Sequence, residues 1–348
     1  MPDRILITGA AGFIGSNLAR YILANTDWDV VSLDRLDEAG ALQAIVDLKQ
    51  SYCDRVTSIW HDLKSPINPA QRSLEPLRRP FRYIAHLAAG SHVDRSIRDP
   101  LLFLHDNVIG TANLLEYVRH HQSPEKTLVF GTDEIYGAAD HNESFDEYDR
   151  WHPTNPYAAS KCGSEALCPA WANTYGMPIV ATHCTNVMGE NQHVEKFIPI
   201  AIERISAGLT LQIHARAGVP SSRCYVHVDN VSSAVLTILE RGTVIGGPGT
   251  GVYNISGADD VSNLAVAQRI AELLGKPLHY ELVENVVNRP RPDMRYAISD
   301  ARLRALGWAP HVSFDEGLRR IVALSTQHVS MSDRPEPSES SVGQLRTA

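Results

Sequence analysis

The sequence predicts an α/β fold, a doubly wound parallel sheet with a smaller, interleaved C-terminal part. Short apolar strands alternate with helical patterns, a glycine-rich turn follows the first strand, and polar residues gather directly after several strands. Such alternation implies right-handed crossovers and a parallel sheet that is covered on both faces. Because ligands of these sheets bind beyond the carboxyl ends of the strands, we expect the functional residues there.

The expected elements follow the chain in order. Strands are expected over residues 4–8, 30–33, 56–60, 83–89, 127–130 and 178–182, with helices from the glycine turn to residue 23 and over 101–120 and 156–175. Later come expected helices over 197–207, 228–241, 261–274 and 302–308, and strands over 210–213 and 252–255. We assign residues 1–185 to a Rossmann-type dinucleotide-binding domain, completed by strands from the C-terminal half, and 186–329 to a substrate-binding part. Residues 330–348 are polar and without an apolar pattern, so we expect a disordered tail.

Composition and charge argue against several classes of function. The chain of 348 residues has a net charge of -8, which disfavours nucleic acid or an anionic membrane as a partner. Its five cysteines are scattered without a CxxC pair, and no histidine pair stands beside carboxylates at metal-ligand spacing. We therefore expect free thiols and no metal site. Without a signal peptide or an apolar run of the roughly 20 residues that span a bilayer, we expect a cytoplasmic protein.

A glycine motif predicts the cofactor. Gly9, Gly12 and Gly15 follow the first strand with the spacing G-x-x-G-x-x-G, which lets a pyrophosphate approach the backbone at a helix N-terminus. A plain tight turn is the alternative interpretation. Asp34 lies at the end of the second strand, about 20 residues later, where a carboxylate binds ribose hydroxyls. An acid there repels a 2'-phosphate and favours NAD over NADP, although Arg35 beside it could accept that phosphate.

A second group of residues predicts the chemistry. Tyr157 and Lys161 are spaced four residues apart, on one face of the expected helix. Any helix can carry such a pair, but after a dinucleotide fold we expect the ammonium to lower the pKa of the phenol and make it a base. Thr132, Asp133 and Glu134 follow an apolar strand. Neighbours in a strand point to opposite faces, so the two acids can meet one substrate only if the backbone turns there; solvated acids are the alternative.

These features together resemble a known family. The glycine triple, Asp34, His-Leu-Ala-Ala at 86–89, Ser-His-Val-Asp-Arg-Ser at 91–96, Thr-Asp-Glu at 132–134 and Tyr157-x-x-x-Lys161 resemble the extended short-chain dehydrogenases/reductases. Within that family, the chain is most similar to the nucleotide-sugar 4,6-dehydratases that include those acting on dTDP-glucose. The resemblance runs from about residue 4 to 324, and the Thr-Asp-Glu triplet is its most specific element.

The resemblance implies a mechanism and a set of binding residues. Tyr157, assisted by Lys161 and Thr132, would take the proton of the sugar 4-hydroxyl while C4 gives hydride to NAD+. Glu134 would remove the C5 proton, Asp133 would protonate the departing 6-hydroxyl, and the hydride would return to C6. The implied cofactor-binding residues are Gly9, Gly12, Phe13, Ile14, Gly15, Asp34, Arg35, Asp62, Leu63, Leu87, Ala88, Ala89, Tyr157 and Lys161. The implied substrate-binding residues are Ser91, His92, Asn186, Glu195, Lys196, Arg223, Arg289, Arg291 and Tyr296.

Other readings stay open at this point. A solvated strand-end acid explains Asp62 nearly as well as an adenine contact does. Gly90, Met188 and Cys224 depart from the dehydratase pattern, which leaves the nucleotide and the sugar open. A 4-epimerase or a UDP-glucuronate decarboxylase would use the same Tyr157 and Lys161, although neither needs an acid at O6. A non-catalytic dinucleotide sensor is the alternative of another class. The resemblance also implies a homodimer, formed by the helices at 101–120 and 156–175.

Overall fold

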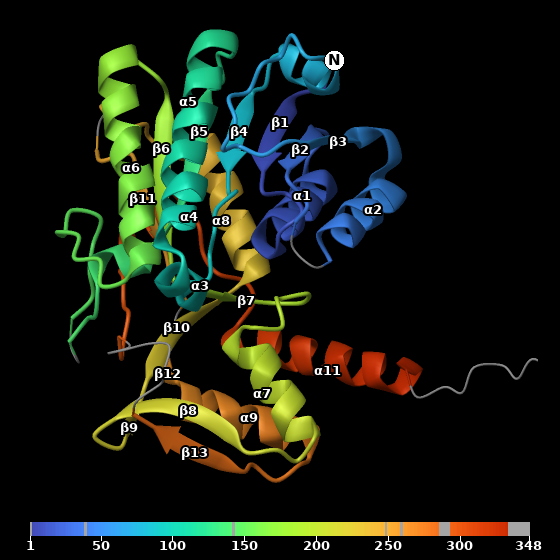
Figure 1. Ribbon diagram of the computed structural model, residues 1–348, viewed down its shortest axis with the longest axis vertical. Coiled ribbons are helices and arrows are strands. Elements are labelled where there is room, and N and C mark those ends of the chain that lie inside the picture. Colours follow the sequence, from blue (N-terminus) through green and yellow to red (C-terminus); the bar gives the residue numbers. More distant parts are fainter. Residues whose placement is uncertain are drawn as a thin grey trace, which may run out of the picture.

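The computed structural model describes residues 2–37, 40–140, 143–247, 249–257, 260–284 and 293–332, with the backbone alone for 327–332. A parallel sheet with helices on both faces makes up the larger part, and a smaller part lies below it in Figure 1. The fold class predicted from the sequence is confirmed.

The large sheet has seven strands in the order β11-β6-β5-β4-β1-β2-β3, and every neighbouring pair is parallel. Its strands are β1 (Arg4–Thr8), β2 (Asp29–Asp34), β3 (Val56–Trp60), β4 (Tyr83–His86), β5 (Lys126–Thr132), β6 (Ile179–Cys184) and β11 (Val252–Ile255). The strand order reverses between β1 and β4, which is where open α/β sheets bind ligands. Strand β11 comes from the C-terminal half of the chain, as the interleaving predicted.

Two cores hold helices against the two faces of this sheet. Alternate residues of β1 enter different cores, with Ile5 and Ile7 on one side and Leu6 on the other. The first core is covered by α1 (Phe13–Asn25), α2 (Ala41–Tyr52) and α8 (Val228–Arg241), and the second by α5 (Gly110–His121) and α6 (Pro156–Tyr175). A strand buried on both faces reads as a continuous apolar run, which is why the sequence shows no alternation there.

The smaller part has its own core beneath two small sheets. One sheet has the order β12-β10-β7 and the other β13-β8-β9. Their strands are β7 (Asn186–Met188), β8 (Leu211–Arg216), β9 (Val219–Pro220), β10 (Ser222–His227), β12 (Asp260–Ser262) and β13 (Tyr280–Val283). The helices are α7 (Phe197–Ser206), α9 (Asn263–Leu274) and α11 (Phe314–Ser332), and α10 (Ala301–Ala305) contacts β11. The expected domain boundaries at 185 and 329 stay a prediction.

Short helical pieces connect these elements. They are η1 (Cys53–Arg55), η2 (Arg72–Arg78), α3 (Val93–Arg98), α4 (Pro100–Leu104), the π-helix η3 (His105–Ile109) and η4 (Asp133–Tyr136). The helix expected over 101–120 is therefore helical throughout but contains a π turn, which is a frequent feature of functional sites.

Several expectations have the observed bounds and others need correction. The strands at 4–8, 56–60 and 252–255 and the helices at 156–175 and 228–241 are confirmed. The strand expected over 83–89 ends at His86, because its partner β1 ends at Thr8 and Gly9 turns away with φ +73°. The helix expected from 261 begins at Asn263, because residues 260–262 pair with β10. Helices α2 and α11 were not predicted; α11 includes residues 330–332, and 333–348 lie outside the described residues.

Candidate active site

The turn between β1 and α1 is packed so closely that it needs glycine at two of its positions. A Cβ on Gly15 would lie 2.1 Å from the carbonyl oxygen of Gly9, and a Cβ on Gly9 would lie 2.6 Å from the backbone nitrogen of Ala88. Gly12 is the N-cap residue of α1 and has no side chain to occupy the first N–H groups of the helix. Those donors and the helix dipole suit a pyrophosphate, so the turn fits a dinucleotide.

Asp34 and Arg35 lie at the end of β2, beside this turn. The Asp34 carboxylate accepts hydrogen bonds from Ala11 N (3.0 Å) and Leu36 N (2.9 Å). The Arg35 guanidinium donates to Asp106 at 2.6 Å and forms a 2.6 Å ion pair with Asp37. Two carboxylates therefore neutralise Arg35, which weakens the expectation that it would accept a 2'-phosphate.

The ends of β3 and β4 carry the other residues expected at the cofactor. Asp62 pairs with Lys64 at 3.3 Å, and the buried Leu63 accepts a hydrogen bond from Asn113 through its carbonyl oxygen (2.7 Å). Leu87, Ala88 and Ala89 follow β4 beside the glycine turn, where Ala88 N donates to the Thr8 hydroxyl at 3.3 Å. The structure thus gathers the expected cofactor residues along the carboxyl edge of the sheet, while their binding role stays a prediction.

The backbone turns at Thr132, Asp133 and Glu134, the residues expected to be catalytic. Thr132 is the last residue of β5, and the 3₁₀ turn η4 begins at Asp133. The Thr132 hydroxyl caps this turn by accepting a hydrogen bond from Glu134 N (3.4 Å). Because the extended backbone ends there, the two acids are released from the strand alternation that would have sent them to opposite faces. This is the turn that the sequence argument required.

Asp133 is a buried acid with an unusual titration. Its side chain is 3% exposed, and no donor among the described residues lies within hydrogen-bonding distance of Oδ2. Burial and the charge of Glu134 raise the pKa of the Asp133 carboxyl to about 7, against the opposing charge of Arg223. A carboxyl that holds its proton near neutral pH can act as a general acid.

Glu134 is held differently from its neighbour. Its Oε2 accepts a hydrogen bond from Asn155 Nδ2 (2.9 Å) and lies 3.4 Å from the Tyr296 hydroxyl, whose single proton is shared with the nearer Asp293 carboxylate. Asn155 also caps α6, the helix that carries Tyr157 and Lys161, by accepting a hydrogen bond from Ala158 N (2.9 Å). The Asn155 side chain therefore joins Glu134 to the start of α6.

Tyr157 and Lys161 lie buried on α6, but they do not interact as we expected. Burial raises the pKa of the Tyr157 phenol, and the charges of Glu134 and Asp133 raise it further. The expected lowering by Lys161 is therefore wrong for the protein's own groups. Lys161 Nζ donates instead to the carbonyl oxygen of Phe130 (2.7 Å), and burial lowers the pKa of this ammonium to about 8.

Asn107 is a site residue that the sequence argument missed. Its side chain exchanges two hydrogen bonds with the backbone of Gly90 (2.7 and 3.1 Å) and donates to the Ser160 hydroxyl at 2.8 Å. Ser160 in turn donates to the carbonyl oxygen of Tyr157 (2.7 Å). Asn107 belongs to the π-helix η3, and hydrophobic periodicity gives no signal for a π turn.

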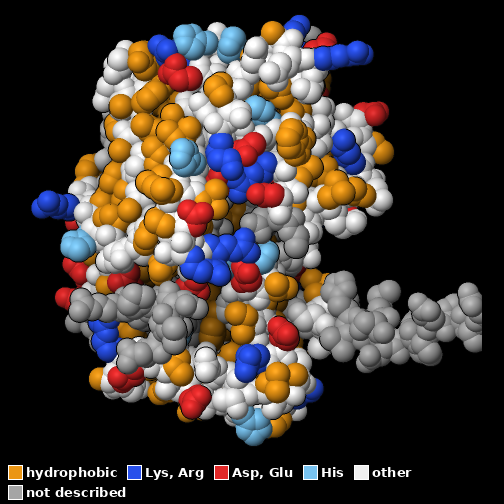
Figure 2. Space-filling model, in the orientation of Figure 1, with side chains coloured by type: hydrophobic (Ala, Val, Ile, Leu, Met, Phe, Trp, Pro, Cys, Tyr) orange, Lys and Arg blue, Asp and Glu red, His pale blue; other side chains and the backbone are white. Residues whose placement is uncertain are grey.

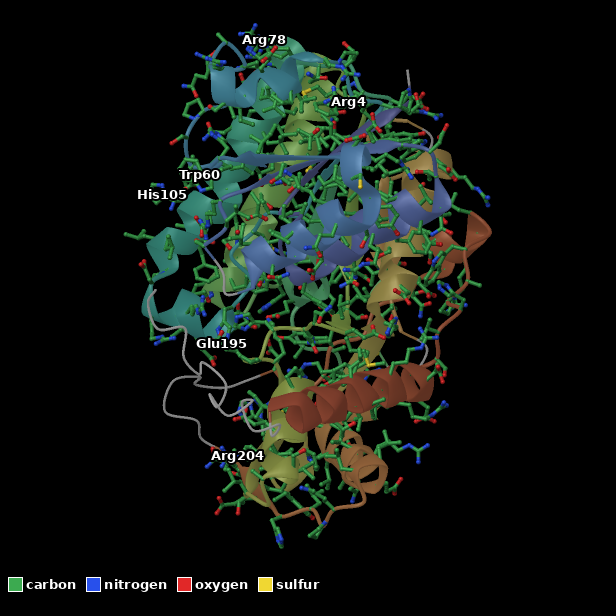
Figure 3. The ribbon with its side chains drawn as sticks, turned by 90° about the vertical axis from the view of Figure 1, so that its right-hand side faces the viewer. Arg4, Trp60, Arg78, His105, Glu195 and Arg204 are labelled. Carbon is green, nitrogen blue, oxygen red and sulfur yellow. The ribbon has the colours of Figure 1, made fainter. Side chains whose placement is uncertain are left out.

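Residues expected at the substrate join the two parts of the molecule. Glu195 contacts His92 Nε2 at 3.0 Å and accepts hydrogen bonds from Arg95 at 3.1 Å through both oxygens. Lys196 donates to the carbonyl oxygen of Ser91 at 3.4 Å. Figure 3 labels Glu195 at the level where the larger and smaller parts meet. The exposed Asn186 lies on β7, and substrate binding by these residues stays a prediction.

Arg223 and Tyr296 lie near the two acids, Arg223 close enough to Asp133 for their charges to interact and Tyr296 beside Glu134. The Arg223 guanidinium lies 4.6 Å from the centroid of the Tyr296 ring and donates to the carbonyl oxygens of Asp293 and Met294 (3.0 and 3.1 Å). The Tyr296 hydroxyl donates to the Asp293 carboxylate at 2.7 Å. Arg289 and Arg291 lie outside the described residues.

The three departures from the dehydratase pattern have different surroundings. A Cβ on Gly90 would lie 3.1 Å from the Phe103 ring, and this ring meets the Tyr157 ring edge-on with centroids 6.4 Å apart. Phe103 thus occupies the space of a side chain at position 90. Met188 is part of the small core. Cys224 is buried and close enough to Asp133 for their charges to interact, and burial raises the pKa of its thiol to about 11.

Two further observations concern membranes and metals. None of the helices within the described residues combines the length and apolar character that a membrane crossing requires. The described ranges also contain no group of three or more histidine, cysteine, aspartate or glutamate side chains placed to hold a metal ion.

Comparisons with known proteins agree with this site. The sequence model of the GDP-mannose 4,6-dehydratase family matches residues 6–321. The dTDP-glucose 4,6-dehydratase of Shigella flexneri is 35% identical over 342 residues, which cover 92% of this chain and 91% of that protein. The structure of DesIV, a dTDP-glucose 4,6-dehydratase from Streptomyces venezuelae with NAD and TYD bound, is 30% identical with a TM-score of 0.82 and covers 94% of this chain and 98% of its own.

An epimerase is also similar in structure. The UDP-glucose 4-epimerase of Thermus thermophilus, in complex with NAD, is 30% identical with a TM-score of 0.80, and the match covers 92% of this chain and 98% of that one. Fold alone therefore does not separate the two reactions. The family match spans nearly the whole chain, and this protein belongs to the GDP-mannose 4,6-dehydratase family of extended short-chain dehydrogenases/reductases.

Proposed function

We propose that this protein is an NAD-dependent nucleotide-sugar 4,6-dehydratase that converts dTDP-glucose, or a related nucleoside diphosphate hexose, to the 4-keto-6-deoxy sugar. One observation carries the proposal. A buried carboxyl that keeps its proton near neutral pH, Asp133, directly precedes a second acid, Glu134, and both interact electrostatically with Tyr157. A 4-epimerase or a decarboxylase needs the tyrosine but has no step for an acid at O6.

Each side chain then has its own task in the reaction. Tyr157 receives the proton of the 4-hydroxyl as its phenolate; burial raises the pKa of the phenol, and the hydrogen bond with Thr132 lowers it. NAD, which the glycine turn and Asp34 would hold, would supply the acceptor for the hydride of C4 and the donor of a hydride to C6. Glu134, oriented by Asn155, removes the C5 proton, which the neighbouring ketone has made acidic. Asp133 delivers its proton to the departing 6-hydroxyl, and Glu134 returns a proton to C5 when C6 receives the hydride.

The cofactor site supports NAD as the dinucleotide. The glycine turn at the N-terminus of α1 supports a pyrophosphate contact, and the Asp34 carboxylate, held beside that turn by Ala11 N, supports a contact with ribose hydroxyls. Because Arg35 is already paired with Asp106 and Asp37, a 2'-phosphate would meet a region of negative charge.

The test is turnover of separate sugar nucleotides. The protein is incubated with dTDP-glucose, UDP-glucose, GDP-mannose and CDP-glucose, and the products are analysed by mass for loss of water. We expect a dehydrated 4-keto product from one of them, absent with Tyr157→Phe. An epimer or a pentose would favour the rival reactions, and binding without any turnover would favour the sensor.

We further propose that the protein is a cytoplasmic homodimer. Leu101, Leu104 and Ile109 are exposed by 65%, 43% and 44%, and Figure 2 shows hydrophobic side chains gathered over α5 and α6. A second copy would cover these side chains. The five unpaired cysteines suit a reducing compartment. Sedimentation tests the assembly, because Leu101→Glu should raise the monomer fraction of a dimer.

A further inference from the structure

A buried polar cluster lies behind the catalytic turn and has no task in the reaction described above. It consists of Glu165 on α6, His183 on β6, Tyr136 at the end of η4, and Asn254 on β11. The side chains of Glu165 and His183 are 6% and 1% exposed. Burying an acid and a base is costly unless each has a partner, so the contacts within this cluster need an explanation.

Hydrogen bonds hold both nitrogens of the histidine ring. His183 Nε2 lies 2.6 Å from the Glu165 carboxylate, and Nδ1 lies 2.9 Å from Oδ1 of Asn254. The amide nitrogen of Asn254 donates to the carbonyl oxygen of Phe145 (3.3 Å), which fixes the orientation of the amide. Nε2 faces a carboxylate, which only accepts, so this nitrogen carries a proton, while Nδ1 faces both the Asn254 oxygen and the Tyr136 hydroxyl, which can donate or accept. Burial lowers the pKa of His183, but Glu165 and Asn254 outweigh it and raise that pKa overall.

The cluster connects the two halves of the catalytic set. The Tyr136 hydroxyl lies 2.7 Å from His183 Nδ1, and Tyr136 is the last residue of the turn that carries Asp133 and Glu134. The same Glu165 carboxylate raises the pKa of Lys161, one helical turn before it, against the burial that lowers it. One carboxylate thus acts on the base side through Lys161 and on the acid side through His183 and Tyr136.

The Glu165–His183 pair is packed closely against β5. Gly131 on β5 pairs with His183 on β6. A Cβ on Gly131 would lie 2.3 Å from the carbonyl oxygen of Thr182 and 3.2 Å from Oε2 of Glu165. Because residue 131 is glycine, Glu165 on α6 and His183 on β6 pack directly against β5, which ends at Thr132.

We propose that the Glu165–His183 pair is a positioning device that fixes η4, with Asp133 and Glu134, relative to Tyr157 and Lys161 on α6. This proposal rests on the proposed function, because it assigns the two acids and the tyrosine to successive steps. The pair contributes no proton to the sugar. Its effect is that Glu134 reaches C5 and Asp133 reaches the 6-hydroxyl of a sugar whose 4-hydroxyl contacts Tyr157 on α6.

The first test removes only the hydroxyl of Tyr136 from the full-length protein with NAD bound. Tyr136→Phe keeps the buried ring but frees η4 from His183. The matched control is Tyr117→Phe, because Tyr117 is equally buried at 2% exposure and its hydroxyl also makes a 2.7 Å hydrogen bond, to the carbonyl oxygen of Leu77 in η2. We expect kcat to fall roughly 10- to 100-fold for Tyr136→Phe with KM unchanged, since a small misplacement costs about that much.

The fraction of reduced cofactor during turnover shows which reaction step has slowed. A general loss of structure would not change this fraction in a defined direction. If η4 is displaced, oxidation at C4 continues while loss of water is delayed, so a larger fraction of the bound cofactor is found reduced during turnover. Tyr117→Phe should show the unmodified fraction and rate. Equal kcat values and equal reduced fractions in the two variants would overturn the proposal.

The second test changes the charge of the pair. Glu165→Gln removes the carboxylate whose charge raises the pKa of both Lys161 and His183, while Lys161 keeps its hydrogen bond to Phe130. The pKa of Lys161 should fall, so the alkaline limb of the kcat profile should move down by roughly one pH unit. Glu165→Asp, which keeps the charge, should restore the limb. A uniform loss of rate at all pH values would overturn the proposal.

The two proposals fail in different ways. An unmodified protein that dehydrates no nucleotide hexose would overturn the proposed function, and the positioning role with it. An unmodified protein that is active, but whose Tyr136→Phe and Glu165→Gln variants behave like Tyr117→Phe, would overturn the positioning role alone.

Discussion

Two groups of charged side chains lie at the carboxyl edge of the same sheet and differ in how they are built. At the end of β2, Asp34 accepts two backbone hydrogen bonds and Arg35 is paired with two carboxylates, both in half-buried positions. At the end of β5 and on α6, Asp133, Tyr157 and Lys161 are buried, and burial shifts the pKa of each. The first group is suited to binding, and the second to proton transfer.

The comparison teaches that burial, rather than the kind of residue, separates the two tasks. Both groups contain an acid directly after a strand, and both contain a cation. Only where the cation and the acid are withdrawn from water do their protons become available near neutral pH. The following predictions test this division, because variants of the β5 group should change kcat and those of the β2 group should change binding.

Tyr157→Phe should have the largest effect. The change removes one hydroxyl from a buried ring, so the fold and the cofactor complex should survive while kcat falls about 10³-fold, within the range for removal of a general base. Turnover is measured by the alkali-induced absorbance of the 4-keto product, and circular dichroism controls for folding. A kcat within tenfold of the unmodified value would mean that another group takes the C4 proton.

Asp133→Asn should lower kcat by about 10²-fold and make the protein more stable at high pH. The pKa of the Asp133 carboxyl rises from its unfolded value of 3.8 to about 7 in the folded protein. Its stabilising contribution is therefore complete below the unfolded pKa and is lost as the pH rises through the folded one. By linkage, the stability gained by the amide relative to the acid should grow by about 2–4 kcal/mol between pH 5 and 8.

The measurement for this variant is thermal unfolding at several pH values. Glu134→Gln is the matched control, because Glu134 is less buried than Asp133 and accepts a hydrogen bond from Asn155. A melting temperature difference between Asp133→Asn and the unmodified protein that does not change with pH would contradict the raised pKa.

Sequence reasoning recovered the β2 group better than the β5 group. The glycine spacing and an acid after a strand are local features, and the structure places Gly15 and Asp34 as that spacing predicts. The pKa argument for Tyr157 failed because i, i+4 spacing shows which side chains share a helix face but not where an ammonium turns. Lys161 turns to a backbone carbonyl. Asn107 and His183 were missed because their partners lie far away in the chain.

Gly15→Ala tests the binding side through the backbone. Its Cβ would lie 2.1 Å from the carbonyl oxygen of Gly9, so β1 and α1 would have to separate. We expect the free energy of unfolding to fall by about 3 kcal/mol, as for an overpacked site, together with loss of bound NAD. Denaturant titration and the cofactor content of the purified protein measure both effects. Gly176→Ala is the control, because a Cβ there meets nothing within 4 Å, although its φ of +67° adds a small strain.

Asp34→Asn should have the smallest effect, confined to binding. The amide still accepts one backbone hydrogen bond, but it loses the charge that favours ribose hydroxyls, which corresponds to about tenfold weaker binding of NAD. Titration of the cofactor-free protein with NAD measures the change, and kcat at saturating NAD should stay within about twofold, because the β5 group is untouched. A large fall in kcat at saturation would show that the two groups are coupled, and the division between a binding edge and a chemical edge would then be wrong.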